Sequence, residues 1–84
     1  MKKIIKFAKP NCSACDMVEQ RLNALGIEHT NLSTYSQEYY GLLDYCKSFG
    51  LIVRQLPVVA LMDGEKIERI WSGVFDINEL QELL

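Results

Sequence analysis

Two cysteines three positions apart, Cys12 and Cys15 in the stretch KPNCSACDMV, constrain this chain more than any other feature. A C-x-x-C pair can hold a metal ion, form a structural disulfide, or exchange electrons with another pair of thiols, and its spacing does not choose among them. The choice depends on where the pair lies in the fold and on what the rest of the chain places around it.

The hydrophobic pattern predicts the order strand, helix, strand, helix, strand, strand, helix. We expect strands at residues 2–8, 27–32, 57–62 and 66–71, and helices at 13–25, 34–49 and 77–84. The first strand–helix–strand unit should be parallel with a right-handed crossover, whereas Asp63-Gly64 between the last two strands indicates an antiparallel hairpin. These elements predict an α/β fold with a mixed sheet and helices packed on it.

Capping patterns set the expected helix ends. Thr34 with Gln37 and Asp76 with Glu79 each match a capping box, and Gly26 is a typical helix terminator. Apolar residues should then line one face of the second helix, and these are Tyr35, Tyr39, Leu42, Leu43, Cys46 and Phe49.

The predicted boundary between the first strand and the first helix places Cys12 at a helix N-terminus. Unpaired backbone N–H groups and the positive end of the helix dipole favour an anion there, so the thiol pKa should fall from about 8.5 into the range of roughly 3.5 to 7.5. Cys15, one turn further on, should be less exposed. This arrangement suits a nucleophilic Cys12 and a resolving Cys15. Lys6 and Lys9 would add positive potential, although solvated lysines are the commoner interpretation for both.

Composition excludes several classes of function. Eighty-four residues, 49% of them apolar, suit one small domain over residues 1–84, and a net charge of −2 with interspersed signs does not favour nucleic acid as a partner. The start, MKKIIKFAK, lacks the apolar run of a secretory signal, and no stretch has membrane-spanning length. We therefore expect a soluble cytoplasmic protein, in a compartment where structural disulfides are rare.

A zinc site remains an alternative, because Cys12, Cys15, His29 and Cys46 could in number form a Cys₃His set. The expected fold does not favour it. Cys46 falls on the buried face of the second helix and His29 on an edge strand, so Cys46 is interpreted as a small core residue. We expect no bound metal.

Three short sequence motifs follow one another along the chain: KPNCSAC after the first strand, VRQLPVV at residues 53–59, and WSG at residues 71–73. Together they resemble the glutaredoxin-like branch of the thioredoxin superfamily, and within it the NrdH-type redoxins. The resemblance implies a thioredoxin fold, βαβαββα, with a four-stranded mixed sheet and helices on both faces. It also implies a thiol–disulfide oxidoreductase that binds no cofactor and cycles through a reversible Cys12–Cys15 disulfide.

The resemblance also assigns site residues. Pro57 matches a cis proline that faces the cysteine pair, and the Leu56 backbone should pair with an extended substrate segment. Lys9, Gly73 and Asp76 are expected to join Leu56 and Pro57 in substrate binding. A docking patch would comprise Ser13, Ala14, Trp71 and Phe75, with Trp71 equally compatible with sheet packing.

For partners, the resemblance implies a monomeric electron carrier that thioredoxin reductase recharges and that reduces a protein disulfide, as NrdH-type redoxins do for class Ib ribonucleotide reductase. Reduction by glutathione, as in glutaredoxins proper, is the alternative, and a zinc-stabilised binding module without redox turnover is the third. Gln55 and the WSG stretch favour the first. The chain departs from the family where Val74 and Phe75 lead straight to Asp76, without the usual arginine and proline.

Overall fold

Strands and helices alternate in the predicted order in this computed structural model, which describes residues 2–50, 53 and 55–84. The elements are β1 (Lys2–Ala8), α1 (Ser13–Ala24), β2 (Thr30–Ser33), α2 (Gln37–Ser48), β3 (Val58–Asp63), β4 (Lys66–Ser72) and α3 (Ile77–Leu83). Leu51, Ile52 and Arg54, the last of which belongs to the quoted VRQLPVV, lie outside the described residues. Within the described ranges, no helix has the length and apolar character needed to cross a membrane.

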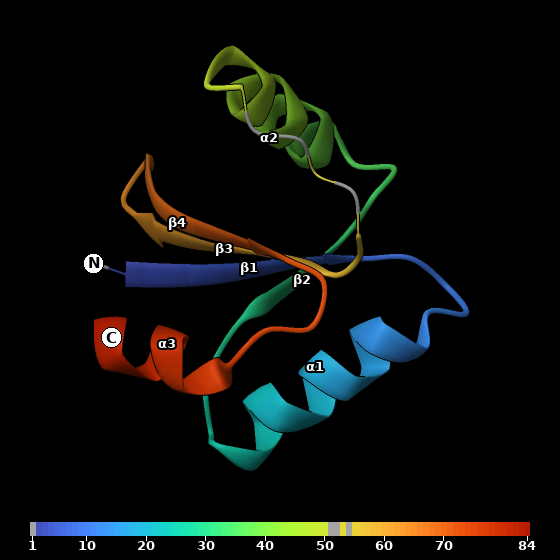
Figure 1. Cartoon of the computed structure of the whole chain (residues 1–84), viewed down its shortest axis with the longest axis vertical. Coiled ribbons are helices and arrows are strands. Elements are labelled where there is room, and N and C mark those ends of the chain that lie inside the picture. Colours follow the sequence, from blue (N-terminus) through green and yellow to red (C-terminus); the bar gives the residue numbers. More distant parts are fainter. Residues whose placement is uncertain (1, 51–52, 54) are drawn as a thin grey trace.

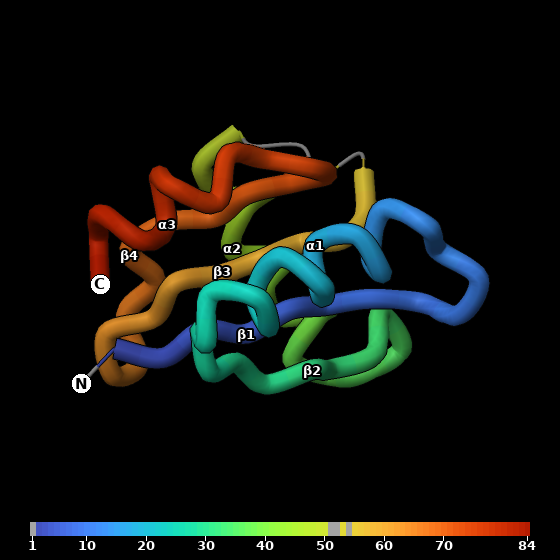
Figure 2. The backbone as a smooth tube through the Cα atoms, turned by 90° about the horizontal axis from the view of Figure 1, so that it is seen from below, coloured from blue at the N-terminus to red at the C-terminus, as the bar shows by residue number. Residues whose placement is uncertain are grey.

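The four strands form one mixed sheet in the order β2-β1-β3-β4. β1 pairs with β2 in parallel, with Ile5 opposite Thr30, and pairs with β3 antiparallel, with Ile5 opposite Ala60. In Figure 1, α2 lies on one face of the sheet while α1 and α3 lie on the other, and Figure 2 shows α1 and α3 together over that second face. The predicted mixed sheet with helices on both faces is confirmed.

Alternation along the strands produces a separate apolar cluster on each face of the sheet. The cluster under α1 and α3 comprises Ile4, Val18, Leu22, Ile27, Val59, Leu61, Trp71, Ile77 and Leu80. The cluster under α2 comprises Phe7, Leu42, Cys46 and Val58. Because Ile4 and Phe7 lie on opposite faces of β1, the strand that leads to the cysteines is fixed from both sides.

The second helix begins later than predicted. Its N-cap is Ser36, whose hydroxyl accepts from the Tyr39 N–H at 3.3 Å, and not Thr34, whose N–H donates to Ala8 O at 3.2 Å beside the sheet. Tyr35 therefore precedes the helix and is 77% exposed, and Phe49, expected on the buried face, is 66% exposed. Of the predicted apolar face, only the central residues, Tyr39, Leu42, Leu43 and Cys46, are buried or half-buried.

The second strand is also shorter than predicted. Ile27 N donates to Leu22 O at 2.9 Å, which holds Ile27 at the end of α1, and β2 starts only at Thr30. Its place at the sheet edge agrees with the prediction.

The β3–β4 hairpin contains an irregularity in register. Met62 lies opposite Ile67 but Leu61 lies opposite Arg69, so Glu68 is an extra residue in β4. As a result Ile67 and Ile70 both pack against the cluster under α2, although they are three positions apart.

Candidate functional site

Cys12 is the N-cap residue of α1. Its backbone is extended, with φ −118° and ψ 102°, and its Sγ accepts from the Cys15 N–H at 3.1 Å. Asn11 makes the turn into the cap with φ 57°, a left-handed conformation that asparagine tolerates better than most residues. The sulfur therefore sits where a helix stabilises negative charge, because a backbone N–H already points at it.

The two sulfurs form a disulfide across this first turn, with 5.2 Å between the Cα atoms of Cys12 and Cys15. Cys12 is partly exposed, whereas Cys15 is only 2% exposed. The pair thus presents one accessible sulfur and one covered sulfur.

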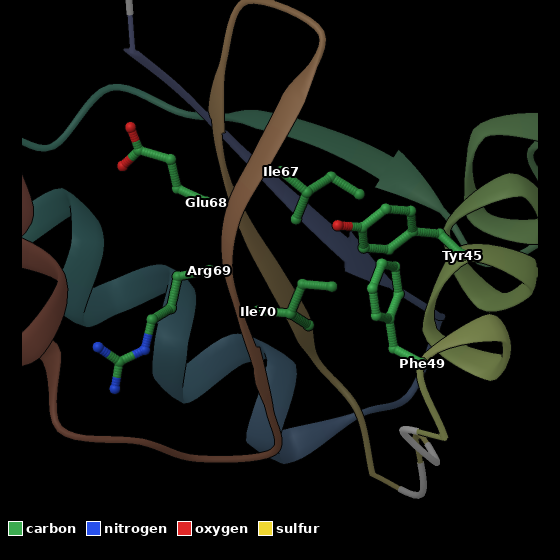
Figure 3. A pocket seen from close by; sticks show the side chains of 6 residues that line it. All are labelled: Tyr45, Phe49, Ile67, Glu68, Arg69 and Ile70. Atoms are coloured by element: carbon green, nitrogen blue, oxygen red, sulfur yellow. The ribbon is translucent and has the colours of Figure 1, made fainter.

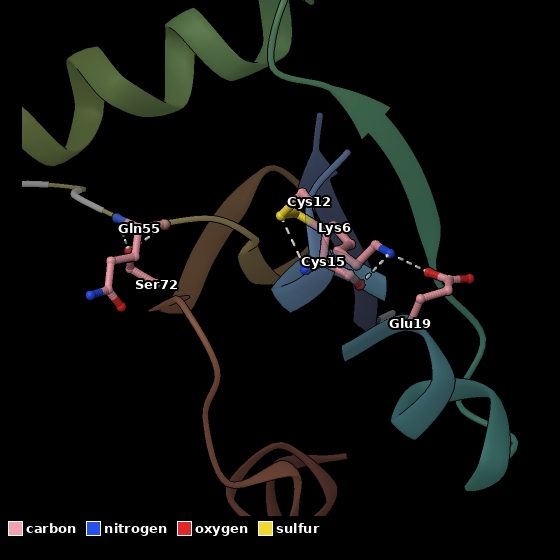
Figure 4. The surroundings of a disulfide bond; sticks show 6 residues. All are labelled: Lys6, Cys12, Cys15, Glu19, Gln55 and Ser72. Carbon is pink, nitrogen blue, oxygen red and sulfur yellow. Dashed lines mark hydrogen bonds and ion pairs between the residues drawn. A yellow bond between two sulfur atoms is a disulfide. The ribbon is translucent and has the colours of Figure 1, made fainter. Parts of the chain in front are cut away.

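The segment before β3 lies beside the cysteines, and the end of β4 holds it in place. The Leu56–Pro57 peptide bond is cis. The Ser72 hydroxyl donates to Gln55 O at 2.7 Å and accepts from Gln55 N at 3.2 Å, and Figure 4 shows this contact next to the disulfide. Gly73 N donates to Pro57 O at 2.9 Å. These bonds tie the chain on both sides of the Leu56–Pro57 bond to the β4 end.

Gly73 is required at its position for two reasons. Its φ is +81°, a conformation that side chains disfavour, and a Cβ built on it would lie 2.5 Å from Gln55 Oε1 and 3.3 Å from Gln55 Cβ. Both a turn and a close backbone approach therefore require glycine at this position.

A cleft opens beside Cys12 between these segments. Its lining residues are Lys9, Cys12, Ala14, Gln55, Leu56, Gly73 and Val74. Lys9, Ala14, Leu56 and Gly73 were expected near the site from the sequence. Gln55 and Val74 were not expected to line the cleft. The signal that could have indicated them was their position in VRQLPVV and directly after WSG.

Asp76, expected to bind substrate, does not line this cleft. Its carboxylate caps α3 by accepting from Asn78 N at 3.0 Å, as a helix N-cap aspartate commonly does. Glu79 does not complete the predicted capping box with it, because its carboxylate accepts from the indole N–H of Trp71 at 3.0 Å.

Trp71 is a core residue, which favours sheet packing over a docking surface, the two roles expected for it. It is 7% exposed and stacks on Phe75, with 4.9 Å between the ring centroids. Phe75 is itself half-buried against the same cluster and does not provide the open apolar patch considered for it. Ser13 is exposed in the first turn of α1 and remains available to a partner.

Lys6, interpreted from the sequence as solvated, is buried with 4% of its surface exposed. Its ammonium donates to Glu19 and to Cys15 O, the latter at 3.4 Å (Figure 4). Glu19 also lies 2.8 Å from His29 Nε2. Burial raises the pKa of Glu19, but the hydrogen bonds from Lys6, His29 and Asn31 outweigh it and lower the pKa from 4.5 to about 2.

The four residues considered for zinc do not converge. Cys46 belongs to α2 and packs against the face of the sheet opposite α1, and burial raises the pKa of its thiol. The His29 ring is engaged by Glu19 and by Ile27 O, which lies 2.9 Å from Nδ1. Among residues 2–50, 53 and 55–84, no group of three or more His, Cys, Asp or Glu side chains could hold a metal ion.

A second hollow lies on the α2 face, lined by Tyr45, Phe49, Ile67, Glu68, Arg69 and Ile70. Figure 3 shows the two aromatic rings and the two isoleucines facing one another, while Glu68 and Arg69 point away to the other side of β4. None of these six residues is a cysteine or a histidine. The cleft beside Cys12 is therefore the candidate active site.

Comparison with known proteins gives a consistent result. No protein-family model matches the chain. A curated relative, the SPbeta prophage-derived thioredoxin-like protein YosR of Bacillus subtilis (strain 168), is 28% identical over 82 residues, which cover 98% of this chain and 94% of the relative.

Among solved structures, the glutaredoxin-like protein NrdH-redoxin from Escherichia coli, described with a thioredoxin-like activity profile, matches with a TM-score of 0.63. The sequences are 21% identical, and the match covers 98% of this chain and 95% of that one. The chain therefore has the thioredoxin fold, and the resemblance seen in its motifs agrees with both comparisons.

Proposed function

We propose that this protein is a small dithiol–disulfide oxidoreductase that reduces protein disulfides through Cys12 and Cys15. The observation that carries the proposal is the pair itself, with a half-exposed Cys12 sulfur capping α1 and a covered Cys15 within disulfide distance. Similarity to a thioredoxin-like protein and to NrdH-redoxin supports it.

The reaction balances without a bound cofactor. The Cys12 thiolate attacks one sulfur of the substrate disulfide, forming a mixed disulfide, and the other substrate sulfur leaves as a thiolate that takes a proton from water. Cys15 then loses its proton to solvent and attacks Cys12 Sγ, which releases the remaining substrate thiolate. Two electrons have passed from the protein dithiol to the substrate, and the Cys12–Cys15 disulfide remains.

The cleft suits an extended peptide as substrate. Leu56 and Cys12 both line the cleft, and the cis Pro57 that follows Leu56 has no N–H of its own. An extended substrate segment that pairs with Leu56 would carry its disulfide towards Cys12, in a form of strand addition. Lys9 and Gly73 line the same cleft and would contact that segment.

For the electron source we propose thioredoxin reductase, and for the target a class Ib ribonucleotide reductase, in the reducing environment of a cytoplasm. The motif resemblance to NrdH-type redoxins supports both. Glutathione is the alternative source. Asp76, expected from the resemblance to bind substrate, would be a contact for glutathione, but its carboxylate caps α3 outside the cleft.

A coupled assay separates these sources. The oxidised protein is mixed with NADPH and thioredoxin reductase, or with NADPH, glutathione and glutathione reductase, and absorbance of NADPH is followed with insulin as substrate. We expect turnover with thioredoxin reductase. Turnover in the glutathione system alone would replace thioredoxin reductase by glutathione, and turnover in neither would refute the oxidoreductase proposal.

Two matched variants test the assignment of the cysteines. Cys12→Ser should abolish reduction, because it removes the attacking sulfur. Cys15→Ser should still attack and should accumulate the mixed disulfide, visible as a mass increase on the intact protein. An adduct on Cys15 in Cys12→Ser that forms as fast would reverse the assignment. Support of ribonucleotide reductase turnover by the reduced protein then tests the target.

A further inference from the structure

Cys15 poses an electrostatic problem that the proposed function does not solve. The resolving step needs its thiolate, but the residue is 2% exposed, and burial in apolar surroundings disfavours an ionised sulfur. The helix terminus helps Cys12 more directly than Cys15, because the N–H of Cys15 itself points at the sulfur of Cys12. A source of positive charge near Cys15 is therefore needed.

Lys6 is a buried charged side chain that contacts Cys15. It is the one charged residue that is buried within the described part of the chain. It stands on β1 beneath the first turn of α1, and its ammonium lies between Cys15 O and the carboxylate of Glu19 (Figure 4). An ammonium bonded to the backbone of Cys15 both fixes that turn and brings a positive charge next to it.

The partners of Lys6 are arranged so that its charge is felt at Cys15. Glu19 lies one helical turn further along α1, so the ion pair has its positive end at Cys15 and its negative end away from it. The Lys6 side chain is 5% exposed and the Glu19 side chain 29%, so water screens the carboxylate more than the ammonium. His29 Nε2 lies 2.8 Å from Glu19 Oε2, the same oxygen that Lys6 bonds, and Asn31 donates to Oε1 at 3.4 Å.

Other charged groups lie around this turn on each neighbouring element. They are Cys12 and Asp16 on α1, Lys9 after β1, Glu19 on α1 and His29 before β2. Asp16 and Lys9 are exposed and of opposite sign, so solvent screens both. On the β3 side, the described residues Gln55, Leu56 and Pro57 carry no charge. Within the described residues, Lys6 is thus the buried cation that bonds the Cys15 turn; the His29 side chain, also 5% exposed, has its ring nitrogens on Glu19 and Ile27 O.

We propose that Lys6 is a positioning residue for the resolving step, whose buried ammonium, paired with Glu19, fixes the Cys15 turn and favours the Cys15 thiolate. This inference rests on the proposed dithiol chemistry. In that step the Cys15 thiolate attacks Cys12 Sγ, the bond between Cys12 and the substrate sulfur breaks, and the substrate sulfur leaves with the electron pair. Lys6 takes no part in the bonds that form or break.

The two half-reactions can be timed separately with 5,5′-dithiobis(2-nitrobenzoate). Attack by Cys12 releases a first thionitrobenzoate, and attack by Cys15 on the resulting mixed disulfide releases a second. All proteins carry Cys46→Ala, so that Cys12 and Cys15 are the remaining thiols. Stopped-flow absorbance from pH 5 to 9 gives the midpoint of each phase.

Lys6→Met should raise the midpoint of the second phase by about 0.5 to 1 pH unit, because a charge acting across the turn should shift a pKa less than the roughly 1–3 units of a charge in direct contact. The first phase should shift less. Lys3→Met, which removes an exposed charge from the same strand, is the matched control and should shift neither phase. Lys6→Arg, which keeps the cation, should restore the low second midpoint.

A second variant protects the test from a folding defect. Lys6→Met with Glu19→Met replaces the ion pair by apolar side chains, a change that proteins often accept, and should give the same second-phase shift. Unchanged second midpoints in both variants, or equal shifts of both phases, would overturn the role of Lys6. If the Lys6-intact protein released no second thionitrobenzoate, the dithiol function itself would fail.

Discussion

Removal of the Glu19 carboxylate should weaken the folded state in a way that depends on pH. In Glu19→Gln, the buried Lys6 ammonium loses its charged partner and keeps Cys15 O. The pKa of Glu19 is lowered from 4.5 to about 2, and at about 1.36 kcal/mol per unit this corresponds to about 3 kcal/mol of linked stability. Because the side chain is 29% exposed, solvent screening reduces the expected value to about 2 kcal/mol.

The sign follows from the direction of the shift. A carboxyl whose folded pKa lies below its unfolded pKa stabilises the fold above the unfolded value, here 4.5, and the contribution is lost as the pH falls through about 2. The free energy of unfolding of the wild type should therefore exceed that of Glu19→Gln by about 2 kcal/mol at pH 6. The difference should shrink to well under 1 kcal/mol near pH 2.

Urea unfolding of the oxidised proteins, followed by circular dichroism between pH 2 and 7, measures this difference directly. Subtracting the Glu19→Gln curve of unfolding free energy against pH from the wild-type curve cancels the contribution of the other carboxylates, which both proteins share. Glu28→Gln, which neutralises an exposed carboxylate, is the matched control and should differ from wild type by less than about 0.5 kcal/mol throughout. A wild-type minus Glu19→Gln difference that stays constant with pH would refute the ion pair as the origin of the shift.

Three further substitutions probe the cleft wall and its support. Gly73→Ala should lower the free energy of unfolding by about 1–2 kcal/mol, because φ is +81° and the new Cβ would displace the Gln55 side chain. Urea unfolding measures this loss, and unchanged stability would show that the close approach is unnecessary. Ser72→Ala removes both hydrogen bonds to the Gln55 backbone. It should clearly slow insulin reduction while lowering the melting temperature only slightly. Trp71→Phe should cost about 1 kcal/mol through loss of the 3.0 Å bond to Glu79 but leave the reduction rate unchanged, and a slowed rate would return Trp71 to the docking surface.

The sequence predicted the order of the elements and the position of the cysteines well, because both depend on local patterns. The β-branched and aromatic run in Lys2–Ala8, helical periodicity after Ser13 and the Asp63-Gly64 pair each involve neighbours within a few positions. The start of α2 was misplaced because Thr34 and Ser36 are both good N-caps, and the hydrogen bond from Thr34 N to Ala8 O, which removes Thr34, comes from a distant part of the chain.

Burial of side chains was harder to predict than their place in an element. Lys6 was taken as solvated because its partners, Cys15 O and Glu19, lie 9 and 13 positions away and become neighbours only when α1 packs over β1. Trp71 and Phe75 are only four positions apart, but their burial depends on distant members of the same cluster, such as Val18 and Leu22. Leu56 and Gly73, which belong to the motifs, line the cleft beside Cys12, and their role in substrate binding stays a prediction.

The extra residue in β4 bears on how this protein meets other chains. A sheet in the order β2-β1-β3-β4 has two open edges, and β4, with seven residues, is the longer of them. A flat edge of this length invites edge-to-edge aggregation, whereas a bulge with a charged residue in it interrupts the row of free backbone groups. Glu68 is such a residue, with its carboxylate 3.3 Å from the Lys2 ammonium. An incoming strand is thereby discouraged from the outer edge of β4, so that this edge competes less with the pairing proposed at Leu56.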